Sequence, residues 1–154
     1  MDDGLDRPAE GRFDGAEHRY PLRVHFEDTD LSGVVYHANY LRFMERARSD
    51  LLRLLGVDQR AHFEAGGGAY AVTDVHIRFR APARLGDALV VASTARAVRA
   101  ASVVIQQRVM RDGAILTQAE VTAALVGPDG RPRRQPADWV ARFERLAAKG
   151  GASE

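Results

Sequence analysis

The chain turns from extended to helical structure within residues 26–48, FEDTDLSGVVYHANYLRFMERAR. The first part is turn-forming, because its Asp side chains can bond nearby backbone N–H groups and Gly33 can adopt a positive φ. Over residues 40–55 the apolar residues recur at helical spacing, Asn39 is a good N-cap residue, and Gly56 ends the pattern. The sequence therefore predicts a long helix whose apolar stripe is broad enough to be wrapped by other elements.

Strand patterns precede and follow this helix. The strand-like segments span residues 18–28, 74–80, 89–98, 102–111 and 114–126. A flexible break at Gly66–Gly68 separates the helix from the later strands. The last two strands flank Asp112-Gly113, a dipeptide that two-residue hairpin turns favour because both positions need a positive φ. Residues 136–147 return to helical spacing, and we expect them to close an edge of the sheet or to pack on it.

This order of elements predicts an α+β fold in which an antiparallel sheet of about five strands wraps around one long helix, rather than alternating βαβ units. We expect a single domain at residues 18–147, between a mobile leader at 1–17 and a mobile tail at 148–154. One helix cannot cover both faces of a sheet. A partly apolar second face therefore predicts a homo-oligomer.

Composition narrows the possible chemistry. The 154 residues include no cysteine, which excludes disulfides, thiolate metal sites and thiol nucleophiles. Lysine and arginine total 22 against 21 acidic residues, for a net charge of +1, and no basic block marks a nucleic-acid-binding protein. No run approaches the roughly 20 apolar residues that span a bilayer, so any membrane contact is expected to be peripheral. The acidic N-terminal segment lacks the apolar run of a secretory signal, which predicts a cytoplasmic protein.

Polar residues gather where the first strand meets the long helix. They are His25, Glu27, Asp28, Asp30, Tyr36, His37 and Asn39. A helix N-terminus at this point would stabilise developing negative charge through its unpaired N–H groups and its dipole. The junction is therefore the part of the chain where the sequence offers a reactive site.

Three interpretations of the junction are open on the residues alone. A calcium loop would place Asp28 and the residues after it at the ligand positions of an EF-hand, but Asn39 stands where the bidentate Glu is needed. A structural turn would use the aspartates only to cap local N–H groups, with His37 on the surface. A reactive site would combine a carboxylate and a histidine with an oxyanion-binding helix start.

Residues 26–48 resemble the signature of the hotdog-fold acyl-CoA thioesterases. They are most similar to the YbgC-type branch, which is similar to 4-hydroxybenzoyl-CoA thioesterase and is associated in bacteria with the Tol-Pal envelope system. The resemblance extends from about Arg19 to Phe143, with residues 82–87, PARLGD, as a second matching stretch. It implies a long helix wrapped by an antiparallel sheet, and assembly into homodimers or homotetramers.

The resemblance also implies roles for single residues. Asp30 matches the essential carboxylate of the family, and His37 matches the histidine that binds or polarises the thioester carbonyl. Asp30 would either attack the carbonyl carbon or activate water, and both routes stay open. Backbone N–H groups near residues 37–39 would stabilise the oxyanion. The further residues expected to bind substrate are Tyr36, Ala38, Asn39, Tyr40 and Arg84.

Other polar residues have weaker claims to a role in this site. Glu45 is expected to be structural. Arg78, Arg80 and Arg84 match phosphate geometry and are candidates for the phosphates of coenzyme A, although most surface arginines are simply solvated. Phe26 stands where some relatives carry a tyrosine, so any contribution from a hydroxyl at that position is lost.

The predicted activity is hydrolysis of acyl-CoA or acyl-carrier-protein thioesters in the cytoplasm. It is expected to need no metal or redox cofactor, because coenzyme A is part of the substrate. The alternative is a non-catalytic protein of the same fold that binds an acyl thioester or an envelope or division partner. A hotdog dehydratase is a further alternative, against which the tight aspartate loop argues. The sequence leaves open the acyl length, the carrier, and the choice between dimer and tetramer.

Overall fold

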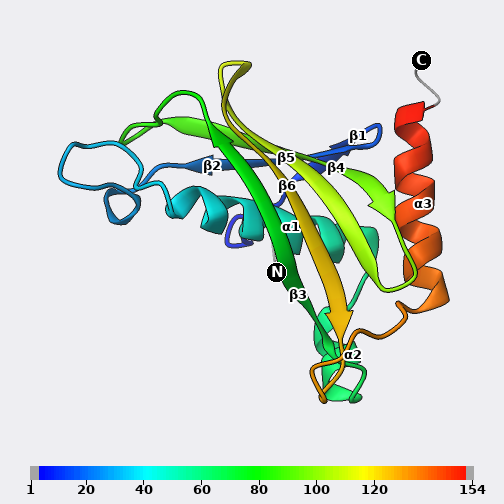
Figure 1. Ribbon diagram of the computed structural model, residues 1–154. Coiled ribbons are helices and arrows are strands. Elements are labelled where there is room, and N and C mark those ends of the chain that lie inside the picture. Colours follow the sequence, from blue (N-terminus) through cyan, green and yellow to red (C-terminus); the bar gives the residue numbers. More distant parts are fainter. Residues whose placement is uncertain (1–3, 152–154) are drawn as a thin grey trace.

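A curved antiparallel sheet wraps the long helix α1 (Asn39–Leu55) in the computed structural model, which describes residues 4–151 (Figure 1). The strands are β1 (Arg12–Asp14), β2 (Glu17–Arg23), β3 (Ala69–Phe79), β4 (Ala88–Val98), β5 (Ser102–Arg111) and β6 (Ala114–Val126). The remaining helices are the 3₁₀ turn η1 (Phe26–Asp28), α2 (Gln59–Glu64) and α3 (Ala137–Gly151). The strand order is β1-β2-β4-β5-β6-β3, so β1 and β3 form the two edges of the sheet.

The α+β architecture predicted from the sequence is confirmed, with one strand more than expected. The sheet has six strands rather than about five, because residues 12–14 pair with β2. A strand of three residues is too short to show a hydrophobic period, and it lies in the stretch 1–17 predicted to be a leader. Helix α3 likewise continues to Gly151, into the predicted tail 148–154. Residues 1–3 and 152–154 of those two stretches lie outside the described residues.

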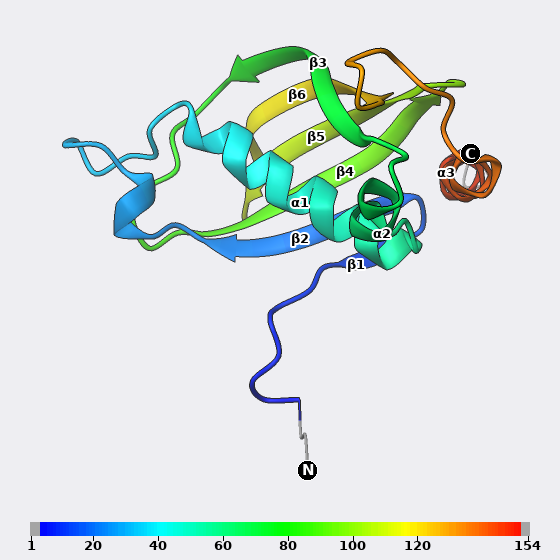
Figure 2. The same cartoon turned by 90° about the horizontal axis from the view of Figure 1, so that it is seen from below.

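Helix α1 lies in the concave face of the sheet, as the view from below in Figure 2 shows. Five of its side chains are at most 3% exposed and form the centre of the core; they are Tyr40, Phe43, Met44, Ala47 and Leu51. Burying a large apolar side chain contributes about 1.5 to 3 kcal/mol. The helix ends at Gly56, which has a φ of 89° and donates its N–H to Arg53 O at 3.1 Å. The predicted apolar stripe is therefore the face around which the sheet closes.

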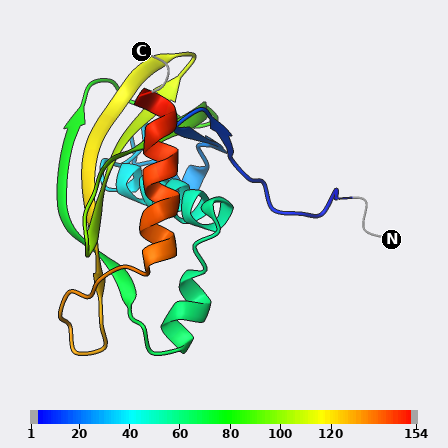
Figure 3. The same ribbon diagram turned by 90° about the vertical axis from the view of Figure 1, so that its right-hand side faces the viewer.

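Helix α3 closes the end of the sheet that surrounds the C-terminal half of α1 (Figure 3). Trp139 and Phe143 of α3 pack with Leu51 and Leu52 of α1 in a cluster that includes Val103 of β5. The junction between β2 and α1 lies at the opposite end of the helix (Figure 1). The C-terminal helix therefore stabilises the fold at a distance from the polar junction.

A buried polar link fastens β2 to α1. His18 Nε2 lies 2.7 Å from Asp50 Oδ2, and both side chains are buried. The same carboxylate accepts the Gly11 N–H at 2.9 Å and an Arg53 N–H at 2.7 Å. His18 Nδ1 has no hydrogen-bond partner within residues 4–151, so a proton on that atom would be buried without an acceptor. Burial lowers the pKa of His18 below its ordinary value of 6.5, against the opposing effect of Asp50.

The free energy of unfolding should therefore fall as the pH drops below 6.5. The unfolded chain binds a proton at His18 at a higher pH than the folded chain does, so acid favours the unfolded state. Urea unfolding at pH values on either side of 6.5 measures the drop. The variant His18→Gln keeps a donor toward Asp50 and should show a weaker drop. An equal pH dependence in both proteins would show that another group is responsible.

Candidate active site

The junction loop, residues 24–38, is closed by bonds to its own backbone. Asp28 O accepts hydrogen bonds from Tyr36 N at 3.0 Å and from Asn39 Nδ2 at 2.8 Å. The Asp28 carboxylate is buried and accepts the His25 N–H at 2.8 Å. Asn39 is therefore not the N-cap that the sequence predicts. It is the first residue of α1, and its side chain bonds back to the loop because Asp28 O lies within reach.

Asp30 lies at the exposed tip of the junction loop. Its Oδ1 accepts hydrogen bonds from Ser32 N at 2.8 Å and from Ser32 Oγ at 2.5 Å. These bonds, the side-chain one first, hold the pKa of Asp30 below its ordinary value, so the carboxylate is ionised at neutral pH. Its Oδ2 makes no hydrogen bond within residues 4–151. Asp30 thus presents a fixed, charged carboxylate with one oxygen available to a ligand.

The start of α1 supplies backbone donors next to this carboxylate in the chain. The N–H groups of His37 and Ala38 form no hydrogen bond within the described part of the chain. Asn39 N, by contrast, donates to Tyr36 O at 2.8 Å. The oxyanion donors expected over residues 37–39 are therefore reduced to two, and unpaired N–H groups at a helix start favour a negative oxygen.

The stretch 82–87 braces the junction loop from the side. Val35 N donates to Ala83 O at 2.9 Å, and Leu85 N donates to Gly33 O at 3.1 Å. Ala83 N donates to the hydroxyl of Tyr40 at 2.9 Å. The two stretches singled out in the sequence, 26–48 and 82–87, therefore lie side by side. Arg84, predicted to bind substrate, is exposed and forms an isolated antiparallel bridge with Val34 of the loop.

Aromatic side chains surround His37. Its ring centroid lies 4.5 Å from that of Tyr36 and 6.2 Å from that of Phe79, the last residue of β3. Tyr36, His37 and Phe79 are all exposed, whereas Tyr40 is buried in the core with its hydroxyl bonded to Ala83. The sequence predicts that Tyr40 binds substrate, but in this protomer its side chain is part of the core. The site lies between the start of α1 and the end of β3.

Two of the candidate arginines lie elsewhere. Ile77 of β3 packs against the core, and side chains alternate between the two faces of a strand. Arg78, and Arg80 directly after the strand, therefore point to the outer face of the sheet. There they line a shallow hollow with His76, beside Glu120 of β6. Of the three arginines considered for coenzyme A phosphates, only Arg84 is brought to the junction loop.

The acidic residues of the junction do not converge on one point. Asp28 is buried against His25 N, whereas Asp30 is exposed and bonded to Ser32. Residues 4–151 contain no group of three or more His, Cys, Asp or Glu side chains placed to hold a metal ion. The geometry therefore favours the reactive carboxylate over the calcium loop.

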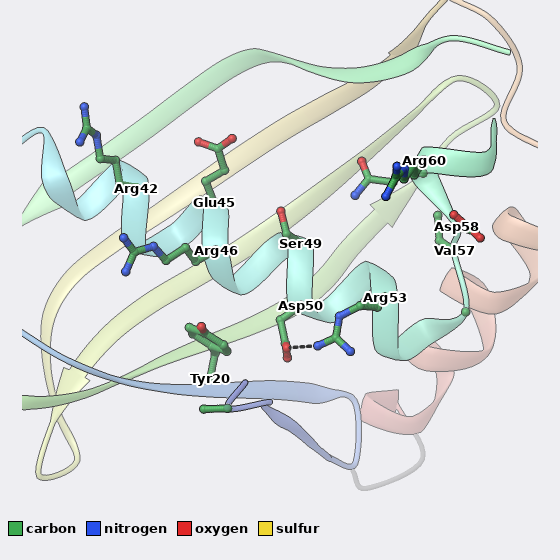
Figure 4. Close-up of a pocket in the computed structure, with 13 residues that line it drawn as sticks. Tyr20, Arg42, Glu45, Arg46, Ser49, Asp50, Arg53, Val57, Asp58 and Arg60 are labelled. Carbon is green, nitrogen blue, oxygen red and sulfur yellow. Dashed lines mark hydrogen bonds and ion pairs between the residues drawn. The ribbon is translucent and has the colours of Figure 1, made fainter. Parts of the chain in front are cut away.

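A broad groove of about 980 Å³ runs along the outward face of α1, away from the junction loop (Figure 4). Arg42, Glu45, Arg46 and Ser49 line it, and Arg53 is bound there to Asp50. Neither Asp30 nor His37 belongs to this groove. Asp30 and His37 themselves are exposed at the surface of the protomer.

Comparison with known proteins identifies the family. The model of the thioesterase-like superfamily matches residues 24–144. The chain belongs to this superfamily. The thioesterase is 40% identical over 129 residues to the acyl-CoA thioester hydrolase YbgC of Escherichia coli O6:H1, a match that covers 82% of this chain and 96% of that protein.

Two further comparisons extend this result. Over 70 residues, 46% of this thioesterase and 48% of the other protein, it is 49% identical to a 1,4-dihydroxy-2-naphthoyl-CoA hydrolase of Thermosynechococcus vestitus. Its structure matches that of a "Probable Thioesterase from Bartonella henselae" with a TM-score of 0.73 and 35% identity, covering 78% of this chain and 99% of that one. The resemblance to hotdog-fold thioesterases of the YbgC type is confirmed.

Two bonds that shape the loop were not predicted individually from the sequence. The buried Asp28 carboxylate accepts the N–H of His25, three residues earlier, and the Tyr40 hydroxyl accepts the N–H of Ala83. A carboxylate two residues before Asp30 is a weak signal, because exposed turns are commonly rich in aspartate. The bond from Ala83 to Tyr40 joins segments 43 residues apart, so only the fold could show it.

Tyr40→Phe should lower the free energy of unfolding by about 1 to 3 kcal/mol, because it leaves the Ala83 N–H buried without an acceptor. Urea unfolding monitored by circular dichroism measures the loss. Tyr20→Phe is the matched control, since the Tyr20 hydroxyl makes no hydrogen bond among the described residues. A Tyr40→Phe protein as stable as the control would contradict this role for the hydroxyl.

Proposed function

We propose that this thioesterase hydrolyses acyl-CoA thioesters at the junction loop, with Asp30 as the reacting carboxylate. The observation that carries the proposal is the pairing of an ionised, outward-facing carboxylate with two unbonded N–H groups at the start of α1. A thioester carbonyl needs both parts: a group that attacks or activates water, and donors that stabilise the negative oxygen.

Each part has a defined role in the proposed reaction. The N–H groups of His37 and Ala38 would donate hydrogen bonds to the developing oxyanion, an effect worth about 2.7 to 4 kcal/mol per donor. The exposed His37 ring would polarise the same carbonyl. In one route Asp30 bonds to the carbonyl carbon, the C–S bond breaks, coenzyme A leaves as a thiolate, and water hydrolyses the anhydride. In the other, Asp30 takes a proton from the attacking water.

The rest of the site would hold the thiol portion of the substrate. Arg84 is exposed beside the loop, and its guanidinium makes no ion pair within the described residues, so we assign it to the phosphates of coenzyme A. The same reaction on an acyl carrier protein remains a proposal that a direct comparison of the two carriers would test. Neither route draws on a metal or a redox cofactor.

We propose that this activity is located in the cytoplasm. None of the helices in residues 4–151 is long and apolar enough to cross a membrane. The association with an envelope system that the resemblance implies would then be made from the cytoplasmic side.

Asp30→Asn should lower thioester hydrolysis at least about a hundredfold while the fold is kept, because the amide can neither attack nor take a proton. Release of coenzyme A, followed with a thiol reagent over a panel of acyl-CoAs, measures the loss. Asp129→Asn is the matched control, since Asp129 makes the same kind of turn, accepting Arg131 N at 3.0 Å, far from the loop in the chain.

Two outcomes would contradict the proposal. Unchanged turnover in the Asp30→Asn protein would exclude Asp30 as the reacting group. A wild-type protein that is stabilised by an acyl-CoA against heat but releases no thiol would favour the alternative, a non-catalytic binding protein of the same fold.

We further propose that two copies of the chain pair through β3 and complete the site. Strand β3 has eleven residues and is an edge strand, with Val72, Val75 and Phe79 each more than 40% exposed. A long apolar edge of this kind is a template for pairing with another chain. Antiparallel pairing about a twofold axis would place the Phe79 end of one β3 beside the Ala69 end of the other.

Val75→Lys should convert the dimer to a monomer, because it would bury an unpaired charge in the apolar edge. Turnover should fall at least about tenfold if the second copy completes the site. Sedimentation measures the mass, and circular dichroism checks that the variant is folded. A Val75→Lys protein with the wild-type mass and turnover would exclude β3 as the interface, and a tetrameric wild type would add a second interface to it.

A further inference from the structure

The tip of the junction loop, residues 30–34, is a short closed turn that begins at Asp30. Asp30 N donates to Val34 O at 3.0 Å, and Gly33 N donates to Asp30 O at 3.1 Å. Gly33 has a φ of 78°, a left-handed value that favours glycine and that lets the chain turn back at this point. These bonds fix the backbone of Asp30, but not the rotation of its side chain.

Ser32 fixes the side chain of Asp30 through two donors. Its N–H and its hydroxyl both bond to Oδ1, at 2.8 Å and 2.5 Å. Each oxygen of a carboxylate has two lone-pair sites, so both sites of Oδ1 are occupied. Oδ2 accepts no hydrogen bond within residues 4–151. The two oxygens of Asp30 are thereby made unequal, because one holds the side chain in place and the other is available to react.

The position of Ser32 is set by contacts from outside the turn. Leu85 N donates to Gly33 O at 3.1 Å, and Val34 forms an isolated antiparallel bridge with Arg84. The stretch 82–87 therefore holds the tip of the loop on which Ser32 lies. Because these contacts join backbone atoms, we expect them to persist when the side chain of Ser32 is replaced.

The hydroxyl of Ser32 is expected to add little to the stability of the fold. Ser32 and Asp30 are both exposed, so each would bond to water if the other side chain were removed. A bond between a hydroxyl and a carboxylate gains strength where water is excluded, as it would be once a substrate covers the loop. The bond should therefore matter more in the complex with substrate than in the free protein.

We propose that Ser32 is a positioning residue for thioester hydrolysis, whose hydroxyl holds Asp30 with Oδ2 toward the thioester. The inference rests on the proposed function, in which Asp30 is the reacting carboxylate. Without the hydroxyl, only the backbone N–H would hold Oδ1, and the carboxylate would also adopt rotations in which Oδ2 points away. Fewer bound substrates would then meet a correctly oriented carboxylate, whereas binding of the substrate itself would not change.

Ser32→Ala should lower kcat about tenfold with KM nearly unchanged, because the lost contact acts on the reacting group and not on substrate binding. Ser32→Thr keeps a hydroxyl and should restore kcat. Release of thiol from an acyl-CoA measures both constants, and circular dichroism checks the fold. Ser49→Ala is the matched control, since it removes an exposed hydroxyl from the outward face of α1, away from the junction loop (Figure 4).

A double-mutant cycle shows whether Ser32 acts through Asp30. In the Asp30→Asn protein the reacting carboxylate is gone, so adding Ser32→Ala should cause no further loss of the residual turnover. A residue that merely supports the loop would lower turnover by the same factor in both backgrounds. The cycle therefore separates a positioning role from a structural one.

The bond can also be measured without turnover. The Ser32 hydroxyl stabilises the charged form of Asp30 and is the main cause of the lowered pKa of that carboxyl group. Ser32→Ala should therefore raise the pKa of Asp30 toward its ordinary value of 3.8, and Ser32→Thr should lower it again. A pH titration followed by NMR of the Asp30 carboxyl carbon measures the change.

Four results would each overturn the inference and leave the proposed function standing. They are a wild-type kcat in Ser32→Ala, equal losses in the two Asp30 backgrounds, no recovery in Ser32→Thr, and an unchanged titration of Asp30 in Ser32→Ala. Full turnover in the Asp30→Asn protein would instead refute the proposed function, and the inference with it.

Discussion

The structure depends on the burial of one broad apolar face on α1. The sheet curves around that face and covers it (Figure 2). Tyr40, at the first turn of the helix, belongs to the buried face, and its hydroxyl also binds the backbone at Ala83. The packing of the core and the position of the junction loop are thus set by the same residue.

The junction loop at the start of α1 is held in place by its own hydrogen bonds. Two of its three acidic residues, Asp28 and Asp30, have opposite surroundings. Asp28 is buried and joins the loop to itself, whereas Asp30 is exposed and bonded only to Ser32. Asp28 therefore fixes the conformation of the loop, whereas Asp30 presents a negative charge at its surface. In the proposed reaction, the two unbonded N–H groups at residues 37 and 38 complete the set of groups that thioester hydrolysis requires.

Much of this arrangement could be predicted from local patterns. The period of the apolar residues predicts α1, the Asp112-Gly113 turn predicts the β5-β6 hairpin, and the motif around Asp30 predicts the family. Asp112 and Gly113 indeed have φ values of 50° and 80°. What could not be predicted depends on contacts between distant segments or on very short elements. The strand β1, the bond from Asn39 to Asp28, and the bond from Ala83 to Tyr40 all belong to this group.

The protomer leaves one feature unfinished, and the proposed pairing of two copies would complete it. Strand β3 is an edge strand with exposed apolar side chains at Val72, Val75 and Phe79. Phe79 also contacts His37 of the junction loop. Pairing at β3 would therefore cover this edge next to the candidate site.

The most direct measurement is a crystal structure of the Asp30→Asn protein with a bound acyl-CoA. The account predicts the thioester carbonyl oxygen within hydrogen-bond distance of the His37 or Ala38 N–H, with the residue 30 side chain facing the carbonyl carbon. A thioester bound anywhere else, such as the groove along the outward face of α1, would contradict it.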